Sequence, residues 1–511
     1  MRIAAHDLGS NSFHTVVVEV HADGSFHEVA REKEMLRLGE VVSRHGVITA
    51  EAAERASLAL RRLRALATAA GANEQVACAT SALREAANGP EVVDQLEQDT
   101  GLRIRVISGK DEARLIFGAV RASVSIDPSP AICLDLGGGS LEISVGDHAG
   151  LQWCTSVHLG VGRLAAELSD PTNFARKDQK RLRERVIATL APAALAVEEL
   201  VPRLLIVTSG TFLDLVRLAI ADRGGQVPLS INNATATRRE LQRVHRRLFE
   251  LSSAQRLSLP GVDGRRGDVL LLGTTLLLTA MDVFGLDCVT AGEWALREGI
   301  VIDAIGLHDL ADWSGDALAV RRASVLALAR RCHWDAGHSR HVTNLATSLF
   351  DQTEALHGLG ADERELLEHA AMLHDIGEHV ASTSHHKHSS YLVRHGALRG
   401  FSPEEVNAIA ALARYHRRSE PKPDHEPYCE LSPPLQQVVG QLAGFLRVAD
   451  GLDRGHDGTV AGVHVKVTPK RVEIVATSAR DADDELEIWG ARRKKAMLEK
   501  CLGRPIEIVA G

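Results

Sequence analysis

Two short stretches of this sequence place an aspartate, a glycine-containing turn and a hydroxyl side chain between two apolar runs. One turn begins at Asp7, and the other begins at Asp135 within the segment AICLDLGGGSLEISV. Such a turn presents backbone N–H groups that bind anions, and its carboxylate holds a hydrated Mg²⁺ that bridges phosphate oxygens. The three glycines of the second turn leave no Cβ where a phosphate oxygen approaches the main chain. The pattern therefore predicts phosphate binding at both turns.

The second turn leads into a strand and not into a helix. Residues 141–145 alternate with a period of two, whereas a dinucleotide-binding loop requires a helix at this point. When Asp7 is aligned with Asp135, the flanks match over about fifteen positions, which indicates an internal duplication. The alignment predicts further phosphate-binding positions in the two turns, namely Gly9, Ser10, Asn11, Ser12, Gly137, Gly138, Gly139 and Ser140.

A third stretch with similar chemistry is LLIVTSGTFLDLVRLA, residues 204–219. It predicts an apolar strand, a polar turn and then a helix whose first amides favour an anion. Ser209, Gly210 and Thr211 are the candidate phosphate contacts in this turn. Ordinary N-capping of the helix by Ser209 or Thr211 is the alternative.

Composition limits the class of partner. The chain has 511 residues, of which 45% are hydrophobic, and this is enough for three or four domains with cores of their own. A net charge of −8 with both signs mixed argues against a nucleic-acid or membrane-surface partner. An anionic substrate must therefore meet local Arg, Lys, metal and backbone N–H groups. Seven scattered cysteines without a CxxC pair predict a reduced, cytoplasmic protein.

We expect no membrane span and no signal peptide. Asp7 interrupts the N-terminus before an apolar segment of sufficient length can form. The longest apolar stretch, residues 269–281, is too short to cross a bilayer and predicts a buried helix.

The order of the elements predicts an α/β protein with four domains. Residues 1–125 alternate strands with helices, 126–308 repeat this arrangement around a hinge at 125–131, 309–456 are helical and rich in histidine, and 457–511 form a small α/β end domain. The predicted strands of the two repeats are 3–8, 12–20, 76–80 and 102–107, then 131–135, 141–146, 152–158 and 203–208. In the end domain we expect a hairpin around Thr468 and Pro469, a helix over 483–503 and a last strand at 506–509.

The duplicated turns and several other segments resemble the Ppx/GppA family of exopolyphosphatases and guanosine pentaphosphate phosphatases, within the actin/Hsp70/sugar-kinase superfamily. The segments are DLGSNSFH (7–14), LRLGE (36–40), ATSALREAAN (79–88), ISGKDEARLIFGAV (107–120), LDLGGGSLEISVGD (134–147), TSGT (208–211) and ALREGI (295–300). The resemblance spans the whole chain and implies two duplicated actin-like (ribonuclease H-like) lobes with an interlobe cleft. Glu293 and Trp294 depart from the family's pattern, so we expect a different cleft lining there.

The resemblance implies roles for four further side chains. Glu112 matches the family's catalytic carboxylate and would deprotonate the attacking water. Arg84 would clamp phosphate bidentately. Asp135 and Glu142 would hold Mg²⁺, or Mn²⁺, in the cleft. Without the resemblance, Glu112 could equally be a helix-start acid that interacts with the helix dipole, and Arg84 could simply pair with a nearby acid.

Three segments of the helical part place histidines and aspartates in a metal-binding order: GHSRHVTNLA (337–346), AAMLHDIGEHV (370–380) and FLRVADGLDR (445–454). They resemble the HD-type metal-dependent phosphohydrolase domain, and the implied ligands are His338, His374, Asp375 and Asp450. Imidazole and carboxylate ligands suit Mn²⁺, Fe²⁺ or Mg²⁺ chemistry. This domain is either a second active site or a metal-bound clamp for a long polyanion.

Two neighbouring segments, HHKHSS (385–390) and RYHRR (414–418), contain more candidate ligands. These segments would provide ligands for a second divalent metal, or contacts to phosphate, through His386, His388, His416 and Arg417. The alternative is that these side chains form a solvated polar surface.

The expected function is metal-dependent hydrolysis of terminal phosphate from inorganic polyphosphate. Hydrolysis of guanosine pentaphosphate is the first alternative, because it needs the same chemistry at the terminal phosphate. Phosphate transfer to a sugar or to acetate, and binding of polyphosphate or an alarmone without turnover, are further alternatives. The resemblance also implies a homodimer.

Overall fold

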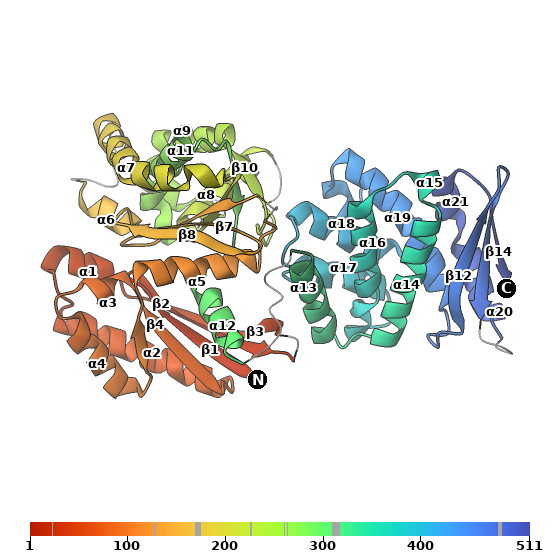
Figure 1. Ribbon diagram of the computed structural model, residues 1–511, viewed down its shortest axis with the longest axis horizontal. Helices are drawn as coiled ribbons and strands as arrows, with labels where there is room; N and C mark the ends of the chain where they lie inside the picture. The colour runs from red at the N-terminus through yellow and green to blue at the C-terminus, as the bar shows by residue number, and fades with distance from the viewer. Residues whose placement is uncertain are drawn as a thin grey trace. The chain divides into compact units, whose positions relative to one another are not determined.

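A computed structural model (Figure 1) describes residues 1–22, 24–126, 129–168, 175–224, 227–259, 261–262, 264–308, 317–478 and 483–511. The chain divides into two units, residues 1–320 and 321–511, with separate hydrophobic cores. The finer division into four domains stays a prediction, as does the hinge at 125–131, part of which lies outside the described residues.

The first half of unit 1 is built on a five-stranded sheet with the strand order β3-β2-β1-β4-β5. Its strands are β1 (Arg2–Leu8), β2 (Ser12–Val20), β3 (Phe26–Met35), β4 (Glu74–Ala79) and β5 (Ile104–Val106). Asp7, at the end of β1, lies opposite His14 on antiparallel β2 and beside Cys78 on parallel β4. The helices of this half are α1 (Leu38–His45), α2 (Ala50–Ala69), α3 (Ser81–Glu85) and α4 (Gly89–Thr100).

The second half repeats this arrangement in a six-stranded sheet with the order β10-β11-β9-β6-β7-β8. Its strands are β6 (Ala131–Leu136), β7 (Leu141–Asp147), β8 (Gly150–Val157), β9 (Leu204–Thr208), β10 (Thr235–Thr237) and β11 (Cys288–Ala291). Asp135 lies opposite Glu142 on antiparallel β7 and beside Thr208 on parallel β9. Asp7 has the equivalent place in the first sheet, so the sheet registers at the two aspartates agree with the predicted duplication.

Two helices join the halves of unit 1. Helix α5 (Gly109–Arg121) follows the first sheet in the chain but lies against β7 and β8, and α12 (Leu296–Gly306) follows the second sheet but lies against β1 and β2 (Figure 1). The two helices also contact each other. One hydrophobic cluster therefore combines side chains from both sheets with Ile116, Phe117 and Ile300 from the two helices.

The second half of unit 1 carries its own helices. They are α6 (Val161–Ala166), α7 (Arg176–Val197), α8 (Gly210–Asp222), α9 (Arg238–Glu250), α10 (Ser253–Leu257) and α11 (Leu270–Phe284), with 3₁₀ turns η1 (Glu198–Leu200) and η2 (Gly264–Val269). The stretch Arg266–Phe284 is long and apolar enough to cross a membrane by length and composition alone, but 67% of it is buried inside the protein. Since α11 contacts α7, α8 and α9, it is a core helix, in agreement with the predicted buried helix.

Unit 2 is a helical bundle that ends in a three-stranded sheet of order β12-β13-β14. Its helices are α13 (Ala317–Arg331), α14 (Ala336–Gln352), α15 (Glu354–His357), α16 (Ala361–Leu373), α17 (His385–His395), α18 (Pro403–Tyr415), α19 (Pro433–Leu452), α20 (Glu485–Lys494) and α21 (Ala496–Leu502), with 3₁₀ turns η3 (Ile376–His379) and η4 (Tyr428–Glu430). The strands are β12 (Val460–Val467), β13 (Val472–Ser478) and β14 (Ile506–Ala510). The helices and the sheet share one continuous core.

The C-terminal prediction is right in its strands and wrong in its helix. β12 and β13 form the expected hairpin around Thr468 and Pro469, and β14 pairs with β13. The single helix expected over 483–503 is two helices that separate at Lys495. No glycine or proline lies near that break, so the sequence carries no signal for it.

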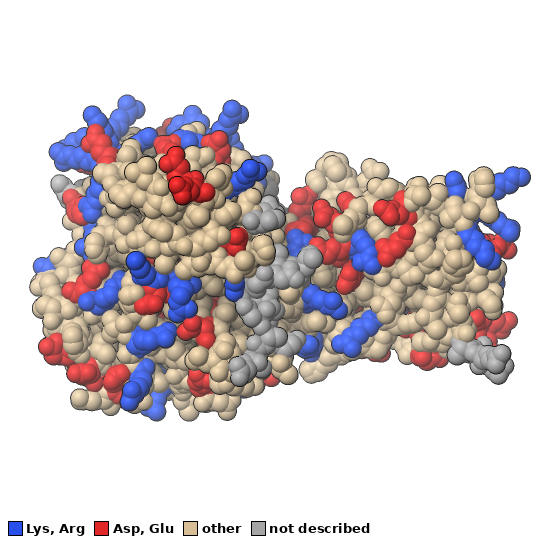
Figure 2. Space-filling view, viewed as in Figure 1, with Lys and Arg blue, Asp and Glu red and all other residues tan. Residues whose placement is uncertain are grey.

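Charge is distributed as the composition predicts. On the face that Figure 2 shows, Lys and Arg are interspersed with Asp and Glu over both units, in keeping with the net charge of −8.

The contact between α5 and α12 gives a stability prediction. A Cβ added at Gly299 would lie 2.1 Å from the carbonyl oxygen of Leu115 on α5, so Gly299→Ala should force the helices apart and destabilise unit 1 by about 1–3 kcal/mol. Gly306→Ala on the same helix is the control, because nothing lies within 4 Å of an added Cβ there. Calorimetry should show a lower unfolding temperature for Gly299→Ala alone, with faster hydrogen exchange in α5. Equal unfolding temperatures for the two variants would contradict this packing.

Candidate functional site

The two duplicated turns of unit 1 lie against each other. A Cβ added at Gly138 would lie 3.5 Å from the Cβ of Ser10 and 3.7 Å from that of Asn11. One added at Gly139 would lie only 2.6 Å from the Oγ of Ser81. The glycine at 139 is therefore required by packing between the two halves, in addition to the ligand approach that the sequence suggests.

The start of α6 neutralises the carbonyl groups of the second turn. The amide of Gly162 donates to the carbonyl oxygen of Gly138 at 2.9 Å, and Arg163 Nε donates to that of Gly139 at 3.2 Å. Carbonyl oxygens that face a phosphate would repel it. Because these carbonyl oxygens accept hydrogen bonds from α6, the turn is more favourable to an anion.

Four carboxylates lie where the two halves meet: Glu112 and Glu142 are buried, and Asp7 and Asp135 are half-buried. Burial, together with the charge of Asp135, raises the pKa of Asp7 to about 7 and that of Glu142 to about 7. Burial also raises the pKa of Asp135, and burial together with the charge of Glu142 raises that of Glu112. These mutual effects place the four predicted residues in one electrostatic neighbourhood.

Two arginines oppose this concentration of negative charge. Arg84 Nη1 lies 3.2 Å from Glu112 Oε2 and donates to the carbonyl oxygen of Ile107 at 2.7 Å. Arg297 lowers the pKa of Asp7 and lies 3.2 Å from His14 Nδ1 through its Nη1. Arg297 lies in the segment ALREGI, whose pattern predicts no role for it, but its half-buried side chain and its effect on the pKa of Asp7 identify it as a residue of the site.

The second hairpin offers oxygen ligands for a cation. Thr208 Oγ1 donates to one oxygen of Asp135, and Ser156 Oγ donates to Glu142 Oε1 at 2.8 Å. Glu142 Oε2 is buried and finds no hydrogen-bond donor among the described residues. An unsatisfied buried carboxylate oxygen facing a second carboxylate fits a hard cation such as Mg²⁺, which takes oxygen ligands.

The third turn lies beside an arginine side chain, that of Arg266. Ser209 has φ of 77°, its side chain makes no capping bond to α8, and its buried Oγ has no partner among the described residues. A Cβ on Gly210 would lie 2.1 Å from Arg266 Nη1. Arg266 Nη1 lies 2.9 Å from Oδ2 of buried Asp214. Burial lowers the pKa of His14, and the charge of Arg266 adds to this effect, so Arg266 lies near His14 and the carboxylates of the two hairpins.

The methyl group of Thr211 packs against α11, because a Cβ added at Gly273 on that helix would lie 2.6 Å from Thr211 Cγ2. The role of its hydroxyl group as a phosphate contact stays a prediction.

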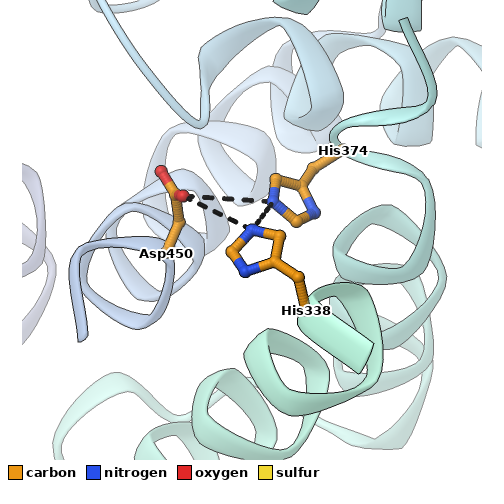
Figure 3. Close-up of side chains that lie close together, drawn as sticks. All are labelled: His338, His374 and Asp450. Atoms are coloured by element: carbon orange, nitrogen blue, oxygen red, sulfur yellow. Dashed lines mark hydrogen bonds and ion pairs between the residues drawn. The ribbon is translucent and has the colours of Figure 1, made fainter. Parts of the chain in front are cut away.

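The predicted residues of unit 2 come together in a buried cluster (Figure 3). His338 on α14, His374 after α16 and Asp450 on α19 point toward one another, with 3.3 Å between the two Nε2 atoms and 4.0 Å from each to Asp450 Oδ1. Asp375 Oδ2 lies 3.6 Å from both Nε2 atoms. These atoms are close enough to hold one metal ion.

The second set of histidines is only partly as predicted. His416 lies 3.3 Å from Asp375 Oδ1, and its neighbour there is His385, which was not among the predicted residues. Arg417 contacts His385 at 2.9 Å. His386 and His388 belong to none of the ligand groups found in the described part of the chain. His385 and His386 are both buried, and the run of three histidines within four residues does not indicate which one faces Asp375.

Comparisons with known proteins agree on one family. The model of the Ppx/GppA phosphatase family matches residues 16–308, and that of Ppx/GppA phosphatase domain III matches residues 320–488. Exopolyphosphatase 1 of Mycobacterium leprae is 31% identical over 326 residues, which are 64% of this chain and 94% of that protein. Exopolyphosphatase 1 of Mycobacterium tuberculosis H37Rv is 32% identical over 303 residues, 59% of this chain and 88% of that protein.

Solved structures show the same fold. A crystal structure of an exopolyphosphatase from Cytophaga hutchinsonii matches with a TM-score of 0.57 and 25% identity, over 61% of this chain and all of that chain. The Aquifex aeolicus member of the Ppx/GppA family matches with a TM-score of 0.53 and 23% identity, over 61% of this chain and 99% of that chain. The expected mixed α/β, actin-like fold is thereby confirmed for the matched part.

The raised pKa of Asp7 gives a pH prediction. A folded-state pKa near 7 against 3.8 in the unfolded chain means that the folded state binds the extra proton, so this contribution to stability is present below about pH 4 and is lost as the pH rises through 7. Asp7→Asn lacks this titrating carboxyl group. In the presence of a chelator, its free energy of unfolding relative to that of wild type should therefore rise between pH 5 and pH 8, by up to about 1.4 kcal/mol per pH unit. The difference between the two unfolding temperatures measures this rise.

The control for this experiment is Glu51→Gln, because Glu51 is exposed on α2. Its difference from wild type should stay constant over the same pH range. A constant difference for Asp7→Asn as well would contradict the buried, protonated carboxyl.

Proposed function

Because this chain belongs to the Ppx/GppA phosphatase family, we propose that it hydrolyses the terminal phosphate of inorganic polyphosphate. Curated relatives in the family carry the name exopolyphosphatase. The proposal also rests on the chemistry of unit 1, where anion-binding turns and two arginines surround buried carboxylates. A phosphoanhydride substrate brings negative charge, so these carboxylates must be protonated or balanced by a cation when it binds.

The observation that carries the proposal is the position of Glu112. It lies in the first turn of α5, is 8% exposed, and has Arg84 at 3.2 Å on one oxygen. Burial and Glu142 raise its pKa, which makes it a stronger proton acceptor than an ordinary carboxylate. Glu112 therefore suits the general base that deprotonates an attacking water.

The proposed reaction needs little covalent chemistry from the protein. Glu112 accepts a proton from water as the water oxygen bonds to the terminal phosphorus. The bridging P–O bond breaks, and orthophosphate leaves from a chain that is one phosphate shorter. Arg84 and Arg266 would neutralise charge on the phosphate oxygens, and Ser10, Asn11 and the glycines of the second turn would hold them by hydrogen bonds. The two turns would bind phosphate groups and would not recognise a particular group at the end of the substrate, such as a nucleoside. This suits a repeating polyanion.

A divalent cation fits the second hairpin, with Asp135 and Glu142 as its ligands. Mg²⁺ bound there would neutralise charge that develops on the phosphate oxygens. The ion would also remove the mutual repulsion that raises the pKa values of these two groups.

Unit 2 contains a second candidate metal site. His338, His374, Asp375 and Asp450 would hold a divalent metal in an HD-type site, since their ligand atoms converge. A cytoplasmic location is supported by the seven cysteines, all of them among the described residues and all free. A homodimer is proposed from the family resemblance.

Phosphate release from candidate substrates tests the reaction directly. Purified protein with Mg²⁺ should release orthophosphate from long-chain polyphosphate faster than from guanosine pentaphosphate at equal concentration of terminal phosphate. The reverse order would favour the guanosine pentaphosphate alternative. Transfer to acetate or a sugar in place of water would contradict hydrolysis, and binding without any phosphate release would identify a sensor.

Replacing the proposed base gives the sharpest single-residue test. Glu112→Gln preserves the shape of the side chain but removes the proton acceptor, so the turnover number should fall by about 10²–10⁴ with little change in KM. Asp111→Asn is the matched control, because Asp111 is exposed in the same helical turn and only caps α5 with Ser108. Turnover by Glu112→Gln close to that of Asp111→Asn would remove Glu112 from this role.

A further inference from the structure

Glu293 and Trp294, which depart from the family's pattern, lie in the segment that follows β11 in unit 1. The amide of Gly292 donates to the carbonyl oxygen of Val207 at 3.0 Å, near the end of β9 and therefore close to the third turn. Trp294 stacks on Phe26 of β3, with 5.1 Å between the ring centroids and 19° between the ring planes. These contacts hold the main chain on both sides of Glu293.

Three hydrogen bonds orient the carboxylate of Glu293. Ser230 Oγ donates to Oε2 at 2.5 Å, and the amide of Ile231 donates to Oε1 at 3.1 Å. Arg217 Nη2 donates to the same Oε1 at 3.3 Å. The side chain of Glu293 is 26% exposed, so its ion pair with Arg217 is screened less than a pair on the open surface. Glu293 is therefore a fixed anchor for one nitrogen of the Arg217 guanidinium.

Arg217 connects Glu293 to a buried aspartate. Arg217 lies on α8, and its Nη1 is 3.2 Å from Oδ1 of Asp214, which lies three residues earlier on the same helix. Oδ2 of Asp214 is 2.9 Å from Arg266 Nη1. The side chain of Asp214 is only 2% exposed, and a buried carboxylate needs such cationic partners. The four side chains thus form one series of alternating charge from Glu293 to Arg266.

The way in which Asp214 is shared between two arginines depends on Glu293. A guanidinium group pairs best with a carboxylate through two parallel hydrogen bonds. With both terminal nitrogens available, Arg217 would form this pair with Asp214 and would compete with Arg266 for Oδ2. Because Glu293 binds Nη2 of Arg217, one oxygen of Asp214 stays with Arg266.

The position of Arg266 is important for an anion at the third turn. Its guanidinium lies against Gly210, the first residue of α8, since a Cβ added at Gly210 would lie 2.1 Å from Arg266 Nη1. The N-terminus of a helix carries partial positive charge, so a cation is repelled there unless a negative group holds it. Asp214 holds this cation in place. A phosphate oxygen at the turn would then interact favourably with the guanidinium and with the first amides of α8 together.

Given the proposed hydrolysis of polyphosphate, on which this inference rests, we propose that Glu293 acts through Arg217 and Asp214 to hold Arg266 as a phosphate-binding group. Glu293 is a positioning residue. It affects the binding of the phosphate chain, and the chemical step belongs to other residues. The departure from the family's pattern at this position thus gives the chain its own means of fixing a phosphate contact.

Steady-state kinetics on polyphosphate separates binding from the chemical step. Glu293→Gln keeps the shape of the side chain but removes the charge that holds Arg217. KM should therefore rise by about 3–10-fold, while kcat stays within about twofold of wild type. Asp287→Asn is the matched control, because it removes an acid that is 90% exposed in the same half of unit 1 and lies outside the series; its KM should not change. An unchanged KM for Glu293→Gln would overturn the inference.

A second substitution distinguishes positioning from a general structural role. Arg217→Met removes the competitor for Asp214, so the double variant Glu293→Gln/Arg217→Met should return to a KM within about twofold of wild type. Two independent structural defects would instead add. A KM for the double variant that is equal to or higher than that of Glu293→Gln would contradict the competition between the two arginines and overturn the inference.

Binding measured without turnover tests the positioning role separately from the proposed function. In a Glu112→Gln background with Mg²⁺, titration calorimetry with tripolyphosphate should show a dissociation constant that rises by about 3–10-fold with Glu293→Gln and falls back when Arg217→Met is added. Equal dissociation constants with and without Glu293→Gln, or no binding by either protein, would overturn the positioning role. Absence of phosphate release from polyphosphate by wild type, with the binding differences intact, would instead refute the proposed hydrolysis alone.

Discussion

Mutual repulsion among buried carboxylates is the constraint that organises unit 1. Asp7, Asp135, Glu142 and Glu112 lie in one region largely shielded from solvent, where ionising all four without a partner would be very costly. The surrounding structure answers this with donors and cations, since hydroxyl groups hold Asp135 and Glu142 and an arginine stands beside each of the other two. The same imbalance makes the region receptive to a divalent cation, and through the cation to phosphate.

Unit 2 solves a related problem with different ligands. In unit 1 the candidate ligands are oxygens, which suit a hydrated Mg²⁺ that exchanges with substrate. In unit 2 the ring nitrogens of His338 and His374 face the carboxylates of Asp375 and Asp450. The two candidate ligand sets therefore differ in their donor atoms, with oxygen alone in unit 1 and imidazole nitrogen with carboxylate oxygen in unit 2.

The sequence predicts the parts of the site that repeat a pattern, and it misses those that depend on three-dimensional approach. The duplicated turns were recognisable because Asp7 and Asp135 share their flanks, and the sheet register confirms the match. Strand β3 was missed because its alternation is masked by charged residues on an exposed strand. Thr208 and Arg297 join the site only through sheet pairing and helix packing. His385 could not be separated from its neighbours, because adjacent histidines on a helix differ only in the direction they face.

The exchange of α5 and α12 between the two halves has a consequence for how the chain is made. The core beside β1 and β2 contains Ile300 and Val301 of α12, which are synthesised long after those strands. The first sheet therefore emerges from the ribosome with one face uncovered and acquires its cover only when almost all of unit 1 has been translated. A nascent chain that stalls before α12 would expose apolar strand surface, which attracts chaperones and promotes aggregation.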